Sequence, residues 1–596
     1  MTDLASPGAA PGTTPGAAPG ATPGASPGTS PGAPGTTGQT GETARIAELE
    51  ARFGDPLDPD NPVGQAAVLA ADERGELLAA GERRLDQVGL NAEFVPRALG
   101  GRFDDADRMA RVLRAVFRRD CTLGLGYGIT NFVGAVPVWT AGDAGQQRAV
   151  ADLLLAGRRV SAGYTELAHG NDFTRNELRA VARGDRLSVT GRKELVNNVS
   201  RADALLLFAR TDDTPGSRGH SHLLVDLTAT DPGRVRHLPR FATAGVRGCL
   251  LGGIEFDDCL VPADSVVGAT GTAMETVLQA FQVTRAVLPS VTIGLLDTQL
   301  RTALGFVRRR RLYDRTVADL PHARGVLAGA FLDLLAADAM ATVVARSLHV
   351  LPDETSVSTA AVKYLVPKLL QEAGYDLSIL VGARSFLRDG PEAIFQKNLR
   401  DLQVVTFAHA NAAVCLATII PQLPRLAARS WFRAEPAPAP VFRPDLELPP
   451  LAFDRLAVTA RGQDRLSATL VAAFETVGDD PDLGPLLGGL IAQFLDLSSE
   501  CADLAPRNRT MVADRRTFVA AQRYATVLAA AAAVGVWQHA TDPFLADPAW
   551  ITGVLHRLST RLGLDPGPLP AALTERLLAE VLRRADHGLT FDLAAS

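Results

Sequence analysis

The sequence predicts a mainly α-helical protein with a central β domain and an additional C-terminal helical domain. Apolar side chains recur at helical spacing on both sides of a strand-rich region, as in DRMARVLRAVFRRDC and AGAFLDLLAADAMATVVARSL. Between these parts, short runs such as ADALLLFAR and SHLLVDL are bounded by Gly, Asp and Pro, which is typical of β-strands. At 596 residues the chain is also too long for one ordinary domain.

Changes in composition divide the chain into six parts. The first carries SPG, APG and TPG repeats with nothing apolar to bury, which predicts disorder. The last shows amphipathic stripes, as in AALTERLLAEVLRR, so we expect it to pack on the preceding bundle and to aid oligomerisation. The expected parts are a disordered arm (1–42), an N-terminal helical domain (43–159), a central β domain (160–270), a four-helix-type bundle (271–432), a Pro-rich linker (433–450) and a helical extension (451–596).

The bulk composition excludes several classes of protein. The net charge of -6 gives no general reason to expect a nucleic-acid or anionic-membrane partner. Five scattered cysteines without a CxxC pair argue against a disulfide framework or a zinc site and favour a reducing, cytoplasmic location. The N-terminus shows no signal pattern, and the most apolar short run, VLAAAAAVGVW, is too short to span a bilayer. No transmembrane segment is therefore expected.

Common catalytic signatures such as GxSxG, GxxxxGK[ST] and HExxH are missing. GLGYG (124–128) lacks dinucleotide spacing and predicts a packed helix. His220 and His222 share one face of an expected strand, but no third metal ligand is evident, so we expect an exposed polar edge and no metal. RRRR (308–311) predicts a solvated helix face, with a phosphate clamp as the alternative.

Specific motifs follow one another in a recognisable order from residue 44 to about residue 430. VPRALGGRFDD resembles a Pro-x-x-x-Gly-Gly segment, LLAGRRVSAGYTELAHGND a Thr-Glu-Pro…Gly-Ser-Asp signature, and VTGRKELVNNVSRADALLLFAR a Gly-x-Lys…Thr-Asn strand pair. Further matches are AGVRGCLLGGIEFDDCLVP, FQVTRAV, RRRLYDR, VGARSFL and FQKNLRDLQVV. In this order the motifs resemble those of the acyl-CoA dehydrogenase family.

The resemblance implies a helix–β–helix fold that holds FAD between the β domain and the C-terminal bundle. In this family a base removes the α-proton of an acyl thioester while the β-hydride passes to the flavin, so the cofactor carries the redox chemistry. The implied partners are acyl-CoA or an acyl carrier protein as substrate, an electron-transfer flavoprotein as acceptor, and further copies of the chain in a homodimer or homotetramer.

The resemblance also assigns cofactor-binding residues one by one. Thr165 matches the Thr that bonds the flavin ring, Asn171 replaces the Ser that reaches the phosphates, and Asn197 replaces a second flavin-bonding Thr. Arg310 matches the Arg that clamps the pyrophosphate, usually across a subunit interface. Gly382 keeps one of two glycines that let the backbone approach the cofactor, while Ala383 replaces the other. Leu195 replaces a Trp beside the flavin, and its alternative is an ordinary core residue.

The expected catalytic carboxylate is absent from this sequence. Phe281 and Arg285 lie in the segment that matches the helix near the thioester. The family's Glu, in an Ile-Tyr-Glu-Gly-Thr context nine residues after the Arg of an Arg-Asp pair, corresponds here to His409. The position used by some relatives corresponds to Thr284, which cannot act as a base. His409 is therefore the candidate base, with an ordinary pKa near ~6.5 that would make activity fall on protonation.

Two classes of function remain open at this point. The first is an FAD-dependent oxidoreductase that dehydrogenates an acyl thioester, with His409 as base or with a substrate acidic enough to need no strong base. The second is a degenerate member of the family that binds partners or acts as a scaffold without dehydrogenase activity. A bound yellow cofactor would separate the two.

Overall fold

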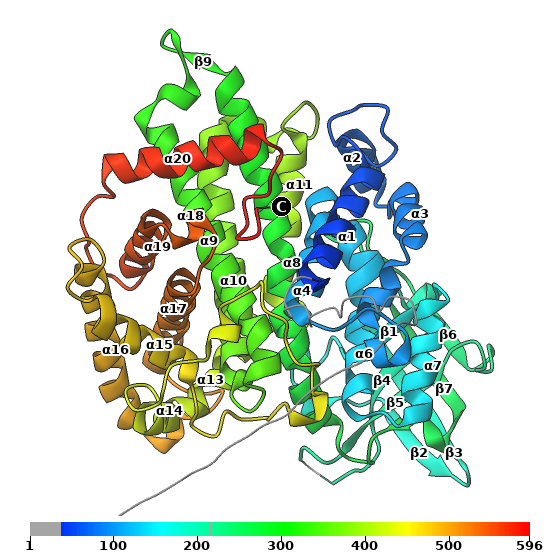
Figure 1. The fold of residues 1–596 in the computed structure, drawn as a ribbon. Helices are drawn as coiled ribbons and strands as arrows, with labels where there is room; N and C mark the ends of the chain where they lie inside the picture. Colours follow the sequence, from blue (N-terminus) through cyan, green and yellow to red (C-terminus); the bar gives the residue numbers. More distant parts are fainter. Residues whose placement is uncertain (1–36, 215, 596) are drawn as a thin grey trace, which may run out of the picture.

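The computed structural model describes residues 37–214 and 216–595. Most of the expected disordered arm therefore lies outside the described residues, and its last part is helical, because α1 begins at Thr37. The order of the described elements is helices, strands, helices and a further set of helices (Figure 1), which confirms the predicted fold class.

The N-terminal helices wrap one side of the central bundle. One of them, α4, begins after Asp105, whose side chain accepts hydrogen bonds from the backbone N–H groups of Asp107 and Arg108. It packs along α8, with almost every side chain buried. The helices are α1 (Thr37–Phe53), α2 (Gln65–Arg74), α3 (Ala79–Gln87), α4 (Ala106–Arg119), α5 (Cys121–Leu123), α6 (Thr130–Ala141) and α7 (Ala144–Leu155).

The β domain is an eight-stranded sheet with its own apolar core. Strands β6, β7, β3, β2, β4, β5 and β8 are neighbours in that order, and β1 pairs in parallel with β4. Apolar side chains of these strands form a cluster separate from that of the helices. The strands are β1 (Val160–Gly163), β2 (Arg179–Arg183), β3 (Arg186–Asn197), β4 (Ala204–Arg210), β5 (His220–Asp226), β6 (Val235–Leu238), β7 (Leu251–Pro262) and β8 (Val266–Val267).

Three long helices form the centre of the molecule. α8, α9 and α10 pack against one another, and a short hairpin of β9 (Arg311–Leu312) and β10 (Arg315–Thr316) joins the first two. The elements of this bundle are α8 (Ala273–Arg309), α9 (Pro321–Val350), α10 (Thr355–Val381), α11 (Ala393–Asp401), α12 (Val404–Phe407), α13 (Ala412–Ile419) and α14 (Leu423–Arg429).

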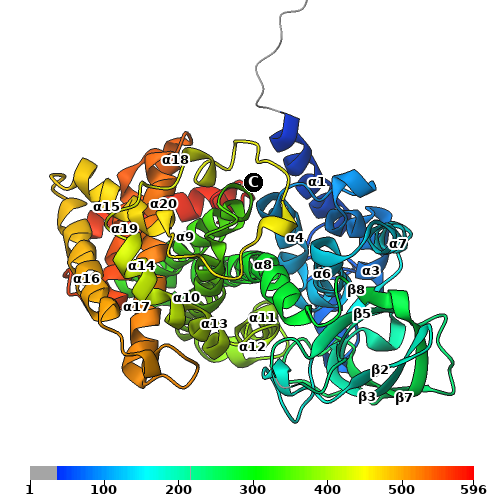
Figure 2. The same cartoon turned by 90° about the horizontal axis from the view of Figure 1, so that it is seen from below.

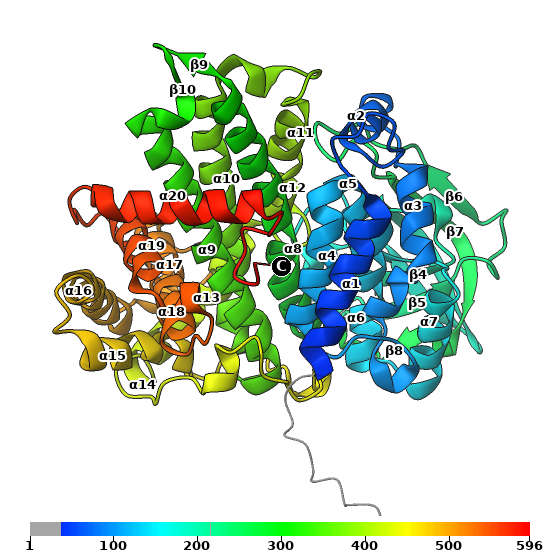
Figure 3. The same ribbon diagram turned by 45° about the horizontal axis from the view of Figure 1, so that its top comes forward.

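The extension and the β domain lie on opposite sides of the bundle, as Figures 2 and 3 both show. Helices α17, α19 and α20 contact α9, and α17 also contacts α10. The extension is not separate in its packing, because its buried apolar side chains belong to the same cluster as those of the bundle. Its helices are α15 (Arg465–Val477), α16 (Gly484–Ala502), α17 (Arg515–Gln538), α18 (Pro543–Ala546), α19 (Pro548–Arg561) and α20 (Ala571–Asp586).

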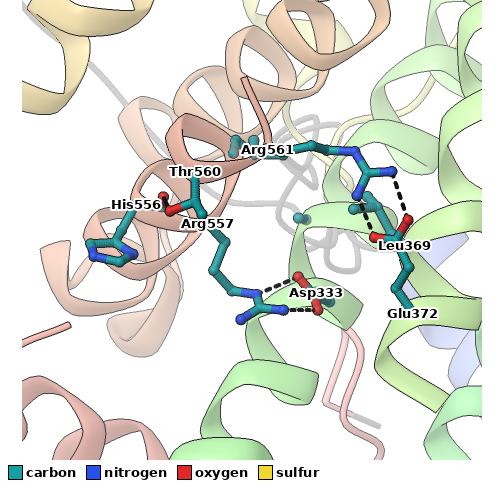
Figure 4. Close-up of a pocket in the computed structure, with 9 residues that line it drawn as sticks. Asp333, Leu369, Glu372, His556, Arg557, Thr560 and Arg561 are labelled. Carbon is teal, nitrogen blue, oxygen red and sulfur yellow. Dashed lines mark hydrogen bonds and ion pairs between the residues drawn. The ribbon is translucent and has the colours of Figure 1, made fainter. Parts of the chain in front are cut away.

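Polar contacts attach both the expected linker and the extension to the bundle. Arg346 of α9 donates to the backbone carbonyls of Pro440 and Leu446 at 2.9 and 2.8 Å, so the stretch 433–450 is held against the bundle. Around a cavity of about 340 Å³ between α19 and the bundle, Arg557 pairs with Asp333, and Arg561 pairs with Glu372 (Figure 4). Each arginine uses two nitrogens, a geometry that adds specificity to the docking.

Four stretches of the described chain are long and apolar enough to cross a membrane by length and composition alone. In three of them, the most apolar window is 83–94% buried inside the molecule, whereas in Ala393–Arg429, which the structure divides among α11 to α14, it is 33% buried. The expected absence of a transmembrane segment stays a prediction. The stretches are Cys121–Ala141, Pro321–Val350, Ala393–Arg429 and Arg515–Gln538.

Candidate functional site

A cavity of about 220 Å³ opens where the N-terminal helices, the β domain and the bundle meet. Its wall combines the ends of β1 and β3 with α6, α8 and the segment after α12. The predicted residues Thr165, Asn171, Asn197, Phe281 and His409 all line it. These five positions span more than 240 residues of sequence, so their convergence supports the site proposed from the motifs.

The end of β1 brings Thr165 and Asn171 to the cavity. The strand stops at Gly163, and the Thr165 carbonyl accepts a hydrogen bond from the backbone N–H of Glu194 at 2.9 Å. This bond holds the loop against β3. The Thr165 side chain is half-buried, and Asn171 is exposed at the cavity's rim. A short hydroxyl and an amide are thus placed as hydrogen-bonding groups along one wall.

An irregular stretch of β3 forms the neighbouring wall. The pairing of β3 with β7 shifts register between Glu194 and Val196, and Leu195 there has φ 55°. A leucine in the left-handed region is unusual, and such bulges re-aim side chains beside functional sites. Leu195 consequently points to the cavity and is 37% exposed. It is not an ordinary core residue, the alternative that the sequence left open.

Asn197 is fixed by its amide nitrogen and leaves its oxygen unused. Nδ2 donates to Thr130 Oγ1 at 2.8 Å, and the backbone carbonyl accepts from Ser161 Oγ at 2.6 Å. The side-chain Oδ1 is buried without a partner among the described residues. Buried polar atoms are normally hydrogen-bonded, so an unpaired one in a cavity wall indicates a ligand or water contact.

The GLGYG segment forms a single π-helical turn, η3 (Gly124–Ile129), rather than a phosphate loop. A Cβ at Gly124 would lie 2.4 Å from the Phe117 ring, so this glycine allows close helix packing. The prediction of a packed helix is confirmed. Leu125 and Ile129 of the turn face the cavity, in line with the frequent use of π-turns at functional sites.

The polar atoms of the cavity fit the ring system of a flavin. Besides Asn197 Oδ1, the hydroxyl oxygens of Tyr164 and Thr243 are buried in its wall without a partner in the described part of the chain. The remaining wall is largely apolar. A planar heteroaromatic ring with hydrogen-bonding edges satisfies both features, and Thr165 adds a further hydroxyl.

His409 lies at the bundle side of the cavity. Its Nε2 and Thr284 Oγ1 share a hydrogen bond of 2.7 Å, and its ring centroid is 4.1 Å from that of Phe281. The backbone is unusual here, since His409 has φ 60° and Ala410 has φ 120°. The loop therefore presents the imidazole in a fixed position, which is what a catalytic or ligand-binding side chain requires.

The surroundings of His409 strongly disfavour its protonation. Burial, together with the positive charges of Lys363 and Arg285, lowers the pKa of His409 to about 3. The ordinary value near ~6.5 assumed from the sequence is therefore wrong for this site. The imidazole is neutral at any physiological pH, and an expected loss of activity through its protonation near neutral pH does not hold.

Arg285 lies behind the cavity wall rather than in it. It is buried, and its guanidinium carbon is 5.8 Å from the centroid of the Phe281 ring. Burial lowers its pKa, and only the negative charge of an ionised Cys415 would oppose this shift. Arg285 is therefore a neighbour of Phe281 and His409 that acts on the cavity through its charge.

Two predicted cofactor residues lie outside the cavity in the single chain. Arg310 is exposed where α8 leads into the β9–β10 hairpin. Gly382, at the end of α10, has φ 67° and open space around the position of a Cβ, so its conformation and not crowding calls for glycine. The assignment of both residues to flavin phosphates stays a prediction.

The expectation for His220 and His222 is wrong in one respect. They share one face of β5, but both are completely buried, so they form no exposed polar edge. Burial lowers the pKa of His222 to about 3 and keeps it neutral. His222 packs against the rings of Tyr164 and Phe208, and the described residues contain no group of three or more metal-binding side chains.

Sequence reasoning missed Tyr164, Thr243 and Lys363. Tyr164 directly precedes Thr165 in a quoted motif, so an aromatic residue with a hydroxyl at that point was an available signal. Lys363 lies in the helical run AAVKYLV, where a lone lysine among apolar residues marks a buried charge. Thr243 lies in a loop and carried no local signal.

Fold and cavity together define a helix–β–helix protein with a cavity between its β domain and C-terminal bundle. Residues 161–259 match the acyl-CoA dehydrogenase middle domain, and residues 272–422 match the acyl-CoA dehydrogenase C-terminal domain. This part of the chain belongs to the acyl-CoA dehydrogenase family, a family of oxidoreductase enzymes.

Relatives of the chain carry the same family name. A Mycobacterium tuberculosis protein named probable acyl-CoA dehydrogenase FadE25 is 24% identical over 335 residues, which cover 56% of this chain and 85% of the relative. Human mitochondrial short-chain specific acyl-CoA dehydrogenase is 26% identical over 243 residues, or 41% of this chain and 58% of the relative.

Solved structures share the fold at lower identity. Butyryl-CoA dehydrogenase from Megasphaera elsdenii has a TM-score of 0.58 at 17% identity, and the match covers 63% of this chain and 96% of the other. A prolyl acyl carrier protein oxidase, AnaB, has a TM-score of 0.55 at 18% identity, covering 64% and 98%. These two matches leave more than a third of this chain uncovered.

Proposed function

We propose that the protein is an FAD-dependent oxidoreductase that dehydrogenates an acyl thioester between its α and β carbons. The observation that carries the proposal is the meeting of Thr165, Asn197, Phe281 and His409 in one cavity between the β domain and the bundle. The β domain offers hydrogen-bonding groups for a flavin ring, and the bundle offers the apolar ring of Phe281 and the imidazole of His409. Family membership supports the same reaction class.

Thr165, Asn197, Tyr164 and Thr243 would hold the flavin ring by its polar edges. FAD, when bound, supplies the acceptor for the β-hydride. At about 220 Å³ the cavity is below the ~300–1,000 Å³ usual for ligand pockets, so a molecule as long as FAD extends beyond it. Asn171 at the rim lies where the cofactor would leave the cavity.

The phosphates would then be bound with help from a second copy of the chain. Arg310 and Gly382 are both exposed, and large apolar side chains beside Gly382 are exposed as well. An apolar patch of this kind marks an interaction surface. We infer a homodimer or homotetramer in which Arg310 of one subunit reaches the cofactor of another. The patch comprises Tyr375, Ile379, Phe386 and Leu387, with Phe386 88% exposed.

His409 would take the α-proton on its Nδ1 atom. Nε2 is engaged by Thr284 Oγ1, and Nδ1 has no hydrogen-bond partner within the described ranges. If the hydroxyl donates to Nε2, Nδ1 carries the proton and cannot accept another. If Nε2–H donates to the hydroxyl, the lone pair of Nδ1 is free to accept one. Base catalysis by His409 requires the second tautomer.

The second candidate function, a binding or scaffold protein without dehydrogenase activity, rests on one observation. With a pKa of about 3, His409 is a weak base, and a proton placed on it would lie beside two cations. A substrate whose α-proton is acidic, or whose charge offsets these cations, removes the difficulty. The scaffold candidate offers no use for the unpaired polar atoms of the cavity.

The purified protein tests both functions. Dehydrogenation requires bound FAD and its bleaching under anaerobic conditions by at least one acyl thioester, carried by CoA or by an acyl carrier protein. A natural acceptor, for which we propose an electron-transferring flavoprotein in the cytoplasm, should then restore the yellow colour. A colourless protein that takes up no FAD on reconstitution excludes the enzyme, and a flavoprotein that no thioester bleaches favours the second function.

A further inference from the structure

Two buried cations beside the cavity lack an acidic partner. Arg285 on α8 and Lys363 on α10 are each 2% exposed. Lys363 Nζ donates to the backbone carbonyl of Val405, while Arg285 Nε has no partner and its guanidinium lies over Phe281. Within the described ranges, neither forms an ion pair with Asp or Glu. Two positive charges are therefore held out of water without compensation.

Several other buried cations of the molecule are paired with carboxylates. Arg114 pairs with Asp338 and Asp592, and Lys397 pairs with both Asp120 and Asp401 at 2.6 Å. A buried charge is costly unless it is paired, and removing one partner leaves a large penalty. These two buried cations have carboxylate partners, whereas the two beside the cavity have none. Arg119 is a further buried cation without an ion pair in the described residues, and it donates to the backbone carbonyls of Gly54 and Val63 instead.

The charges of Arg285 and Lys363 act on the cavity itself. Both disfavour a proton on His409, which lines the cavity. Lys363 contacts Val405, next to the lining residue Val404, and Arg285 contacts the lining residue Phe281. The described residues that line the cavity include no Asp or Glu. The bundle side of the cavity is therefore electropositive.

We propose that the acyl group of the substrate carries a carboxylate, which lies beside His409 and supplies the counter-charge for Arg285 and Lys363. The proposal rests on the proposed function and specifies its substrate class. A carboxylate need not touch either cation, because charges in a partly buried site attract one another several-fold more strongly than in water. It would also lower the cost of a proton on His409.

The thiolate of Cys415 is the competing source of negative charge. Cys415 is buried, and its charge would raise the pKa of both Arg285 and Lys363. Only the ionised form carries that charge, because a thiol is neutral. If the thiolate were present, it would offset one of the two positive charges and weaken the attraction for an anionic acyl group, so its removal should then strengthen the preference for the free carboxylates.

The test compares succinyl and glutaryl thioesters with the methyl esters of the same acyl groups. For the flavin-loaded protein, we measure the concentration that half-saturates anaerobic flavin bleaching and, separately, the rise in Tm that each thioester causes. We expect the free carboxylates to act at about one tenth of the concentration that their esters require. A tenfold difference corresponds to the free energy of a shift of one pKa unit. Equal action of acids and esters in both measurements overturns the proposal.

Substitution of the two cations tests whether they cause the preference for free carboxylates over esters. Lys363→Met and Arg285→Met should each reduce the preference towards unity, while Lys368→Met, a control on the same helix whose Nζ lies 4.8 Å from the Tyr364 ring, should retain it. If Arg285→Met does not fold, the preference measured for Lys363→Met alone decides whether the cations attract the carboxylate. A preference that persists in Lys363→Met contradicts the proposal. A preference that is absent from the wild type but appears in Cys415→Ala identifies the thiolate as the counter-ion and also contradicts it.

The Tm measurement separates this proposal from the proposed function. If no thioester bleaches the flavin but the free carboxylates raise Tm more than their esters do, dehydrogenation fails and the carboxylate site stands. If all thioesters bleach the flavin and the esters do so equally well, dehydrogenation stands and the carboxylate site fails.

Discussion

His409 Nε2 lies 2.7 Å from Thr284 Oγ1, so the two positions at which the family resemblance allows a catalytic base are joined by a hydrogen bond. Neither position carries a carboxylate. A neutral imidazole and a hydroxyl stand there instead, next to Phe281. The hydroxyl fixes the orientation of the ring, as hydrogen-bond partners of functional histidines do.

Replacing His409 tests its role as the base. A positioned base contributes on the order of 10²–10⁴-fold, so His409→Ala should slow flavin reduction by that factor while FAD content stays unchanged. His409→Glu should preserve or raise dehydrogenation of simple acyl thioesters. Rapid-mixing measurement of flavin bleaching decides the matter. Equal rates in wild type and His409→Ala show that His409 is not the base.

Thr284→Val tests the hydrogen bond separately. Loss of the hydroxyl frees the imidazole to change tautomer and orientation, so bleaching should slow less than in His409→Ala, with thioester affinity little changed. Thr284→Ser, which keeps the hydroxyl, should restore the rate. If Thr284→Val and Thr284→Ser are slowed alike, the effect comes from packing and not from the hydrogen bond.

Acid should destabilise the protein through His222. Burial lowers its pKa from 6.5 to about 3, so the unfolded state binds more protons between these values and stability falls as pH drops from 6.5. At pH 5 the loss is about 2 kcal/mol at most. His222→Leu should be less sensitive to acid across this window. The free energy of unfolding of both proteins is measured with denaturant at pH 7 and pH 5. If His222→Leu loses as much stability between these pH values as the wild type does, the prediction is contradicted.

The sequence predicted the order of helices and strands well, because apolar periodicity and the family motifs both record backbone structure. It also brought together Thr165, Asn197, Phe281 and His409, since each lies in or beside a motif. It could not show the charge around His409. Lys363 lies 46 residues from His409 in sequence, and its effect depends on burial and packing that no local pattern records. For the same reason His220 and His222 were expected at an exposed edge.

Arg310→Ala should weaken FAD retention by removing a guanidinium contact to a phosphate. Its side chain is exposed and forms no ion pair in the described part of the chain, so the substitution should leave folding intact. Flavin content after gel filtration is the measurement, with Arg311→Ala, another exposed arginine, as control. Equal flavin content in both variants and the wild type would remove Arg310 from the cofactor site.

Removal of the extension by truncation after Pro450 should expose apolar surface of α9 and α10. Helices α17, α19 and α20 cover α9 and share its apolar cluster. The truncated protein should aggregate or change its assembly, as light scattering would report. Arg557→Ala, which breaks only the pair with Asp333, should keep the wild-type assembly. A truncated protein of unchanged solubility and subunit number would show that the extension is dispensable for both.

Ala410→Gly should stabilise the protein. Ala410 is buried with φ 120°, a conformation that costs a residue with a Cβ on the order of 1–3 kcal/mol. Glycine removes this strain, and the added freedom of the unfolded chain costs about 0.4–1 kcal/mol in return. The net gain should be about 1 kcal/mol, measured by denaturant unfolding. Ala412→Gly, at the start of α13, is the control and should destabilise, since glycine disfavours a helix. If Ala410→Gly lowers stability as Ala412→Gly does, position 410 is not strained. If it stabilises the protein but slows flavin bleaching, the strain holds His409 in its working position.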